Sequence, residues 1–181
     1  FLADNGACAE DIPEGVSVDE LVSKLMIARS HTRSGEPVHF GNDTGRMPGP
    51  ENTYQSYGTA WANLSNTPFR LYKHWIHEGG IATPLIAHWP SGIKARNELR
   101  TQPGHLIDIL PTCLEATGVE FPDSFRGKVT AAPHGSSLLS AAGGAELPER
   151  PMFWEHGTRR AVYQDGWKLA ADGRGAPWKL Y

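Results

Sequence analysis

Cysteine, excess charge of one sign and long apolar runs are scarce in this sequence. Its two cysteines permit at most one disulfide and match no metal-finger spacing. The formal net charge of −3 gives no reason to expect nucleic acid or an anionic membrane as a partner. No apolar stretch approaches the length that crosses a bilayer, and no internal repeat is found. With 39% hydrophobic and 20% charged residues, the composition is typical of a globular protein.

Several familiar catalytic motifs are also missing. The eight histidines form no His-Glu-x-x-His pattern, and no glycine-rich phosphate loop is present. Gly135-Ser-Ser lacks the second glycine of a nucleophile elbow. His105 and Asp108 lie at the start of a predicted helix, where capping explains the carboxylate better than catalysis does.

The segment from Asn66 to Pro90 organises the chain. Apolar residues at spacings of three and four predict a helix that begins at Pro68 and ends at Gly79-Gly80. The apolar run from Ile81 to Trp89 predicts a strand that is covered on both faces. This arrangement delivers Lys73 to the end of a buried strand. Spacing alone favours the alternative, a core-lining helix whose lysine faces water.

The remaining pattern predicts an α/β protein. Helices are expected from Val18 to about Arg29, from Tyr57 to Ser65 and from His105 to Thr117, the last with a kink at Pro111. Residues 30–55 are expected to be loop. Residues 119–150 are expected to be loop-rich, with a short helix at Ser136 to Leu139.

Near the end of the chain the sequence pattern becomes typical of β-strands. Strand patterns at 152–154, 161–163, 167–170 and 177–181, with a hairpin at Gln164-Asp-Gly166, predict a small antiparallel sheet. We therefore expect residues 1–150 to belong to an α/β domain and residues 151–181 to begin a small antiparallel subdomain.

Asp4 and Asn5 are the candidate metal ligands. They follow Phe1-Leu-Ala, a pattern expected to be the end of a buried strand, where open α/β sheets place their ligand sites. A carboxylate and an amide oxygen suit Ca²⁺ or Mg²⁺, which take six or more oxygen ligands. As an isolated pattern, Asp-Asn-Gly is better explained as a turn.

Four blocks in order carry a family resemblance: Phe1-Leu-Ala-Asp-Asn-Gly6, Asn66-Thr-Pro-Phe-Arg-Leu-Tyr-Lys73 with Glu78-Gly-Gly-Ile-Ala-Thr-Pro-Leu-Ile86, His105-Leu-Ile-Asp-Ile-Leu-Pro-Thr112, and Arg160-Ala-Val-Tyr-Gln-Asp-Gly-Trp-Lys-Leu169. Together they resemble the C-terminal portion of a type I sulfatase, of the arylsulfatase family in the alkaline phosphatase superfamily. The resemblance spans nearly the whole chain.

The resemblance implies a hydrolase of sulfate esters, of small molecules or glycans, that uses a formylglycine made from cysteine or serine. It implies an alkaline-phosphatase-like sandwich with a mostly parallel sheet, followed by the small antiparallel sheet. By the same resemblance Asp4 and Asn5 are ligands of one Ca²⁺ ion. Lys73 is then both catalytic and substrate-binding, because it contacts the sulfate and the leaving oxygen.

The departures from the family pattern are equally specific. Neither Cys8, followed by Ala-Glu-Asp, nor Cys113, followed by Leu-Glu-Ala, fits the Cys/Ser-x-Pro/Ala-x-Arg nucleophile motif. Both ends of the chain also resemble interrupted strands. We therefore expect a fragment that is inactive alone, completed by an N-terminal half that supplies the formylglycine and the remaining calcium ligands. The resemblance implies a periplasmic or secreted protein.

Two alternatives from other classes remain. A phosphatase or phosphodiesterase of the same superfamily would use a serine or threonine nucleophile. A non-catalytic carbohydrate- or partner-binding module has support only from the aromatic-rich tail.

Overall fold

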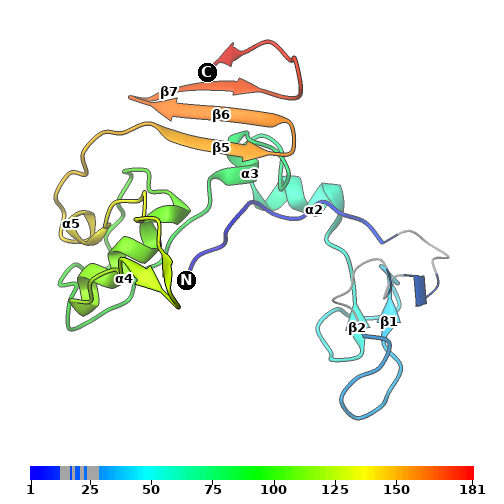
Figure 1. Cartoon of the computed structure of the whole chain (residues 1–181). Helices are drawn as coiled ribbons and strands as arrows, with labels where there is room; N and C mark the ends of the chain where they lie inside the picture. The colour runs from blue at the N-terminus through cyan, green and yellow to red at the C-terminus, as the bar shows by residue number, and fades with distance from the viewer. Residues whose placement is uncertain (13–16, 18, 21–22, 24–28) are drawn as a thin grey trace. The chain divides into compact units, whose positions relative to one another are not determined.

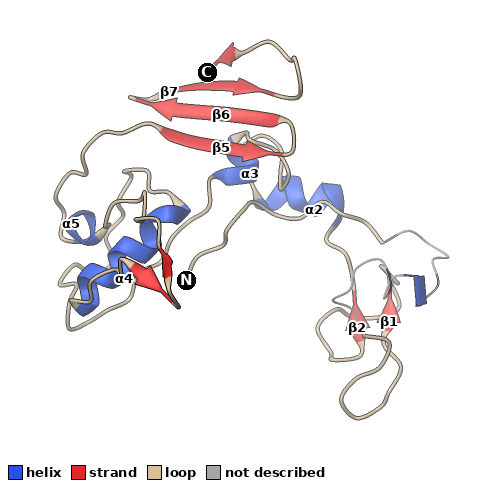
Figure 2. Cartoon of the chain, viewed as in Figure 1, coloured by secondary structure: helices blue, strands red, loops and turns tan. Residues whose placement is uncertain are grey.

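The structure, a computed structural model, describes residues 1–12, 17, 19–20, 23 and 29–181. These residues form two compact units. The N-terminal unit is Asn5–Thr83, and the C-terminal unit is Phe1–Asp4 with Pro84–Tyr181. Figure 1 labels most of the elements of each unit, and Figure 2 shows that helices and strands are short and joined by long loops.

The described part of the N-terminal unit includes a short parallel strand pair and the helices α2 and α3. Strand β1 (His39–Phe40) pairs with β2 (Thr53–Tyr54), and the rings of Phe40 and Tyr54 lie 5.4 Å apart. Sequence analysis predicted only loop here, so this pair is a correction. The glycines and prolines around it keep each strand to two residues.

Helix α2 (Gly58–Ser65) confirms the short helix predicted from Tyr57 to Ser65. It buries Ala62 completely, while Trp61 and Leu64 are exposed. The predicted helix from Val18 to about Arg29 rests on Val18, Leu21, Val22, Leu25 and Met26, which lie outside the described residues. At the start of this segment the Glu20 backbone N–H donates to the Ser17 hydroxyl over 3.2 Å, as at a helix N-terminus.

The helix predicted from Pro68 to Gly79-Gly80 is wrong. Residues 66–77 form turns and bends, and the short helix α3 (Glu78–Ile81) contains both glycines that were expected to end it. Leu71 and His74 adopt φ values of 68° and 78°. A right-handed helix cannot pass through such left-handed residues, so the apolar spacing of this segment does not produce one.

The glycines of this segment instead allow backbones to approach closely. A Cβ on Gly79 would overlap the carbonyl oxygens of Arg70 and Leu71, and one on Gly80 would overlap the carbonyl oxygen of Trp75. Gly6 crosses the same place and donates its N–H to the Gly80 carbonyl over 2.9 Å. Glycine is required here because any side chain would separate these backbones.

The strand expected from Ile81 to Trp89 is wrong as well. Leu85 forms an isolated antiparallel bridge with Leu2, and the Ile86 N–H donates to the Phe1 carbonyl over 2.8 Å. Leu85 and Ile86 are 45% and 60% exposed, so the run is not covered on both faces. An apolar run predicts burial only where neighbouring strands flank it, and within the described residues these flanking strands are missing.

The C-terminal unit begins with the helix that the sequence predicts most clearly. A 3-10 turn, η1 (Leu106–Asp108), leads into α4 (Ile109–Thr117), which ends at Gly118 with φ 67°. Pro111 lies in the first turn of α4, where its missing N–H breaks no intrahelical bond. The predicted interruption therefore falls at the junction of η1 and α4 and not at Pro111.

Two smaller elements follow α4. Strands β3 (Ser124–Phe125) and β4 (Lys128–Val129) form an antiparallel hairpin that sequence analysis missed. Helix α5 (Leu139–Ala142) begins where the predicted helix from Ser136 to Leu139 was expected to end.

The antiparallel sheet predicted at the end of the chain is confirmed. Strands β5 (Met152–His156), β6 (Arg159–Gln164), β7 (Trp167–Ala171) and β8 (Lys179–Leu180) pair in that order (Figure 1). The turn between β6 and β7 is formed by Asp165 and Gly166 with φ values of 51° and 81°, as a two-residue hairpin requires.

The structure thus supports the α/β class and the antiparallel C-terminal sheet. Within the described residues the only parallel pairing is β1 with β2, so no mostly parallel sheet is seen. The alkaline-phosphatase-like sandwich and the division at residue 150 stay predictions. None of the described helices has the length and apolar character needed to cross a membrane.

The close approach at α3 generates a stability prediction. Gly79→Ala should destabilise the N-terminal unit by about 1–3 kcal/mol, because the new methyl group displaces the backbone of Arg70 and Leu71. Faster amide hydrogen exchange at Gly6 and Gly80 would report the loss. Gly173→Ala is the matched control, since a Cβ there meets only the Thr158 hydroxyl at 3.9 Å. Equal exchange in both variants would contradict the packing argument.

Candidate functional site

Lys73 lies on a loop whose backbone is tied down by the side chain of Asn66. The Asn66 amide accepts the Ala7 N–H over 3.1 Å and donates to the Leu71 carbonyl over 2.9 Å. An amide can do both because it carries an acceptor oxygen and two donor hydrogens. Asn66 therefore links the segment after Asn5 to the loop that carries Lys73.

Left-handed residues flank Lys73 on both sides. Leu71 and His74 have positive φ values, a conformation that costs a non-glycine residue about 1–2 kcal/mol. Such conformations persist only where the surrounding structure imposes them, and they gather at functional sites. The backbone of the Lys73 loop is therefore consistent with a candidate functional segment.

Lys73 makes three contacts with the segment that follows Asn5. Its backbone N–H donates to the Ala7 carbonyl over 3.0 Å. Its ammonium nitrogen Nζ lies 3.4 Å from Glu10 Oε1 and 3.8 Å from Cys8 Sγ. The side chain is 32% exposed, so it remains accessible to a ligand.

Glu10 is the centre of this cluster. Its Oε1 atom also lies 3.0 Å from His74 Nε2, and its Oε2 atom accepts the Cys8 thiol over 3.3 Å. The hydrogen bond with His74 is the largest cause that lowers the pKa of Glu10, followed by the bond from Cys8 and the charge of Lys73. The carboxylate is therefore favoured as the charged form.

The predicted calcium ligands lie in a bend that begins two residues after Leu2, which forms the bridge with Leu85. Asp4 is exposed and belongs to the C-terminal unit; Asn5 is half-buried and belongs to the N-terminal unit. Asn5 precedes Ala7, the residue whose carbonyl accepts the Lys73 N–H. The structure thus brings Lys73 to the segment that carries Asn5.

Asp4 and Asn5 offer the type of ligand atom that calcium prefers, but too few ligand atoms to complete a calcium site. Their carboxylate and amide oxygens are ligands that calcium prefers, yet the ion takes six to eight oxygen atoms. Among the residues that the structure describes, no cluster of three or more His, Cys, Asp or Glu side chains could hold a metal ion. Further ligands would therefore be needed to complete a site at Asp4 and Asn5.

His105 and Asp108 form a structural cap, as predicted. The buried Asp108 carboxylate accepts the backbone N–H groups of His105 over 2.7 Å and of Ser136 over 2.9 Å, and it pairs with Arg150. The His105 ring contacts the sheet, with Nε2 3.2 Å from the Phe153 carbonyl oxygen. With every oxygen occupied, this carboxylate holds η1 in place and is not available to a ligand.

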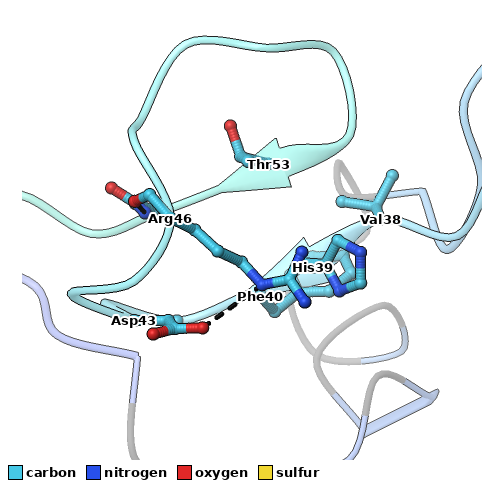
Figure 3. A pocket seen from close by; sticks show the side chains of 8 residues that line it. Val38, His39, Phe40, Asp43, Arg46 and Thr53 are labelled. Atoms are coloured by element: carbon cyan, nitrogen blue, oxygen red, sulfur yellow. Dashed lines mark hydrogen bonds and ion pairs between the residues drawn. The ribbon is translucent and has the colours of Figure 1, made fainter.

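Two cavities lie away from the predicted site residues. The larger, about 350 Å³, is in the N-terminal unit beside β1 and β2, and Figure 3 shows Arg46 reaching across it to Asp43. The smaller, about 220 Å³, is in the C-terminal unit beside Asp108 and Arg150. Neither is lined by Asp4, Asn5 or Lys73. Lys73 is partly exposed, and the candidate site is the cluster of side chains around it.

Comparison with known proteins then gives the family. No family model matches the chain. It is, however, 31% identical over its whole length to an uncharacterised sulfatase of Schizosaccharomyces pombe, and it covers 31% of that protein. The chain belongs to the sulfatase family. The match supports the resemblance carried by the four sequence blocks.

Further relatives agree with this assignment. The sulfatase chain is 31% identical to human N-acetylgalactosamine-6-sulfatase over 77% of its own length and 24% of that enzyme. It is 31% identical to an arylsulfatase of Klebsiella aerogenes over 56% of its own length and 22% of that enzyme. It thus spans less than a third of the length of these three relatives.

Sequence analysis selected Lys73 but missed Glu10, Cys8 and His74. The available signal was weak: His74 is the neighbour of Lys73, and Glu10 follows Cys8 by two residues. In the predicted helix, the side chains of the adjacent residues Lys73 and His74 would point in different directions. The left-handed turn at His74 is what aims both side chains at one carboxylate.

The Glu10 cluster predicts a measurable titration. In the folded sulfatase chain Glu10 should titrate below its ordinary pKa, so its stabilising contribution is complete above that ordinary value and is lost as the pH falls through the lowered one. Carbon-detected NMR of the Glu10 carboxyl group measures this directly. His74→Ala should raise the Glu10 pKa, because it removes the hydrogen bond that contributes most to lowering that pKa. A wild-type pKa at or above the ordinary value would contradict the geometry.

Proposed function

We propose that this chain forms part of an arylsulfatase-like enzyme that hydrolyses sulfuric esters of small molecules or glycans. The relatives named above are sulfatases, one of them an arylsulfatase and another specific by name for N-acetylgalactosamine 6-sulfate. Hydrolysis requires that charge on the leaving oxygen be stabilised while the S–O bond breaks. A lysine ammonium, a compact charge with three donors, suits that task.

The observation that carries the proposal is the attachment of Lys73 to the segment after Asp4-Asn5. The backbone bond from Lys73 to Ala7 and the ion pair with Glu10 attach the lysine to residues that follow Asp4 and Asn5 in the sequence. In this proposal Lys73 binds the sulfate group and stabilises the leaving oxygen. Its contribution grows as charge develops, so it acts more on the transition state than on the bound ester.

Calcium is proposed to bind at Asp4 and Asn5. When bound, a divalent cation would polarise the sulfate oxygens as a Lewis acid. Asp4 would supply a charged ligand and Asn5 a neutral one, with the remaining ligands coming from outside this pair. The exposure of Asp4 supports this, because an exposed carboxylate can be reached by an ion without repacking.

The formylglycine nucleophile is proposed to come from a residue outside these 181 residues. Cys8 and Cys113, both free thiols in the structure, lack the family motif. Cys8 instead donates to Glu10 and lies against Lys73. The phosphatase and binding-module alternatives receive no support from the names of the relatives, and phosphate esters provide the test that separates the first of them.

The Lys73 role can be tested on esters of different leaving groups. In the active enzyme, Lys73→Ala should lower kcat and kcat/KM together by about a hundredfold, as for other preorganised donors to a developing oxyanion. The loss should be smaller for esters whose leaving group is a weak base, since less charge then needs stabilisation. Lys128→Ala, at an exposed strand position, is the control. A loss of the same size for every leaving group would make Lys73 a binding residue only, and faster turnover of phosphate esters would favour the phosphatase.

The calcium role can be tested separately from catalysis. Asp4→Ala should weaken calcium binding, because it removes a hard anionic ligand from an exposed position and leaves the fold intact. Isothermal calorimetry on the active enzyme measures the affinity. Asp123→Ala, which removes another exposed carboxylate, should leave it unchanged. Unchanged affinity in Asp4→Ala would remove this residue from the proposed site.

A further inference from the structure

We propose that Glu10 is the positioning residue for Lys73: its carboxylate fixes the direction of the lysine ammonium, and His74 and Cys8 fix the carboxylate. The inference rests on the proposed function of Lys73 and adds a residue to it. Glu10 would touch neither the sulfate nor the metal, so its effect on hydrolysis passes through Lys73.

The first support is that each carboxylate oxygen of Glu10 has a partner. Oε1 is shared by Lys73 Nζ at 3.4 Å and His74 Nε2 at 3.0 Å, and Oε2 accepts the Cys8 thiol at 3.3 Å. The Glu10 side chain is 58% exposed. An exposed glutamate without such partners would sample many rotamers, and these contacts select one of them.

The second support is that Lys73 is held at two separated points. Its backbone is bonded to Ala7 and its ammonium to Glu10, and both belong to the same segment of the N-terminal unit. A lysine side chain has a long flexible stem, and attachment at both ends fixes its course. The ammonium has three donor hydrogens; the contacts with Glu10 and Cys8 engage two, and the third can be given to an ester oxygen.

The third support is the strained backbone. His74 reaches Glu10 Oε1 from a residue with φ 78°, immediately after Lys73. Two adjacent side chains of a regular helix or strand point to different sides, whereas these two meet one oxygen atom. The left-handed conformation of His74 is therefore the feature that allows Lys73 and His74 to share a carboxylate.

The direct test is the chemical reactivity of Lys73, which needs no enzymatic activity. Reductive dimethylation followed by mass spectrometry gives the labelling rate of Lys73 relative to the exposed Lys128 in the same sample. Glu10→Gln keeps the size of the side chain and removes its charge. We expect this variant to label Lys73 several-fold faster than the wild type. Glu98→Gln, which removes a similar exposed partner of Arg100 at 2.8 Å, should leave the Lys73 rate unchanged.

An unchanged Lys73 rate in Glu10→Gln would overturn the proposal, provided that amide exchange shows the N-terminal unit folded. Because Glu10 is exposed and glutamine is nearly isosteric, loss of folding is not the expected result. Should folding fail, His74→Ala provides the second variant: it removes one of the contacts that fix Glu10 and should also accelerate labelling, by less than Glu10→Gln. Equal rates in His74→Ala and the wild type would then count against the arrangement.

Kinetic measurements on the active enzyme distinguish a positioning role of Glu10 from a role in ester binding. In the active enzyme, Glu10→Gln should lower kcat about tenfold while KM changes by less than about twofold, because misdirection of the ammonium harms the transition state more than the bound ester. Faster labelling with unchanged kcat would overturn the catalytic part. If the wild-type enzyme hydrolyses no sulfate ester, the proposed function fails, and the labelling experiment still decides whether Glu10 positions Lys73.

Discussion

The N-terminal unit depends on the close contact of three backbone segments: the one at Gly6, helix α3 with Gly79 and Gly80, and the loop of residues 70–75. Side chains at these positions would overlap neighbouring carbonyl oxygens, so the contact exists only because all three residues are glycine. Through it the segment after Asn5 lies against α3, and Lys73 reaches Ala7 from the adjoining loop. The backbone contacts at these glycines therefore position the two segments that carry the side chains of the candidate site.

The C-terminal unit has a comparable centre in the buried carboxylate of Asp108. A charge in the interior requires partners, and Asp108 finds them in two backbone N–H groups and Arg150. Ser136 and Arg150 come from distant parts of the chain and tie η1 to the segments before α5 and β5. The two carboxylates differ in their surroundings: Asp108 is buried and accepts backbone N–H groups as well as Arg150, while Glu10 is exposed and is contacted by the side chains of Lys73, His74 and Cys8.

The family assignment and the geometry answer different questions. The sulfatase relatives give the family, and the chain covers 31%, 22% and 24% of the lengths of the three relatives compared. The local geometry says how Lys73 is held. Lys73 is partly exposed and contacts the carboxylate of Glu10, and Asp4 and Asn5 carry the kinds of oxygen that calcium prefers. The open character of this cluster agrees with a site that other residues complete.

The elements that could be predicted from the sequence have local causes: α2, α4 with its glycine cap, and the β6–β7 hairpin at Asp165-Gly166. The family could be predicted as well, because four short sequence blocks carry the resemblance. Prediction from the sequence failed between Pro68 and Trp89, where helical spacing of apolar residues was outweighed by left-handed turns and by backbone contact with Gly6. Such contacts join residues far apart in the chain, so periodicity does not register them. Lys73 was identifiable from its motif, but its pairing with Glu10 was decided by tertiary structure, because only the folded loop brings the two charges together.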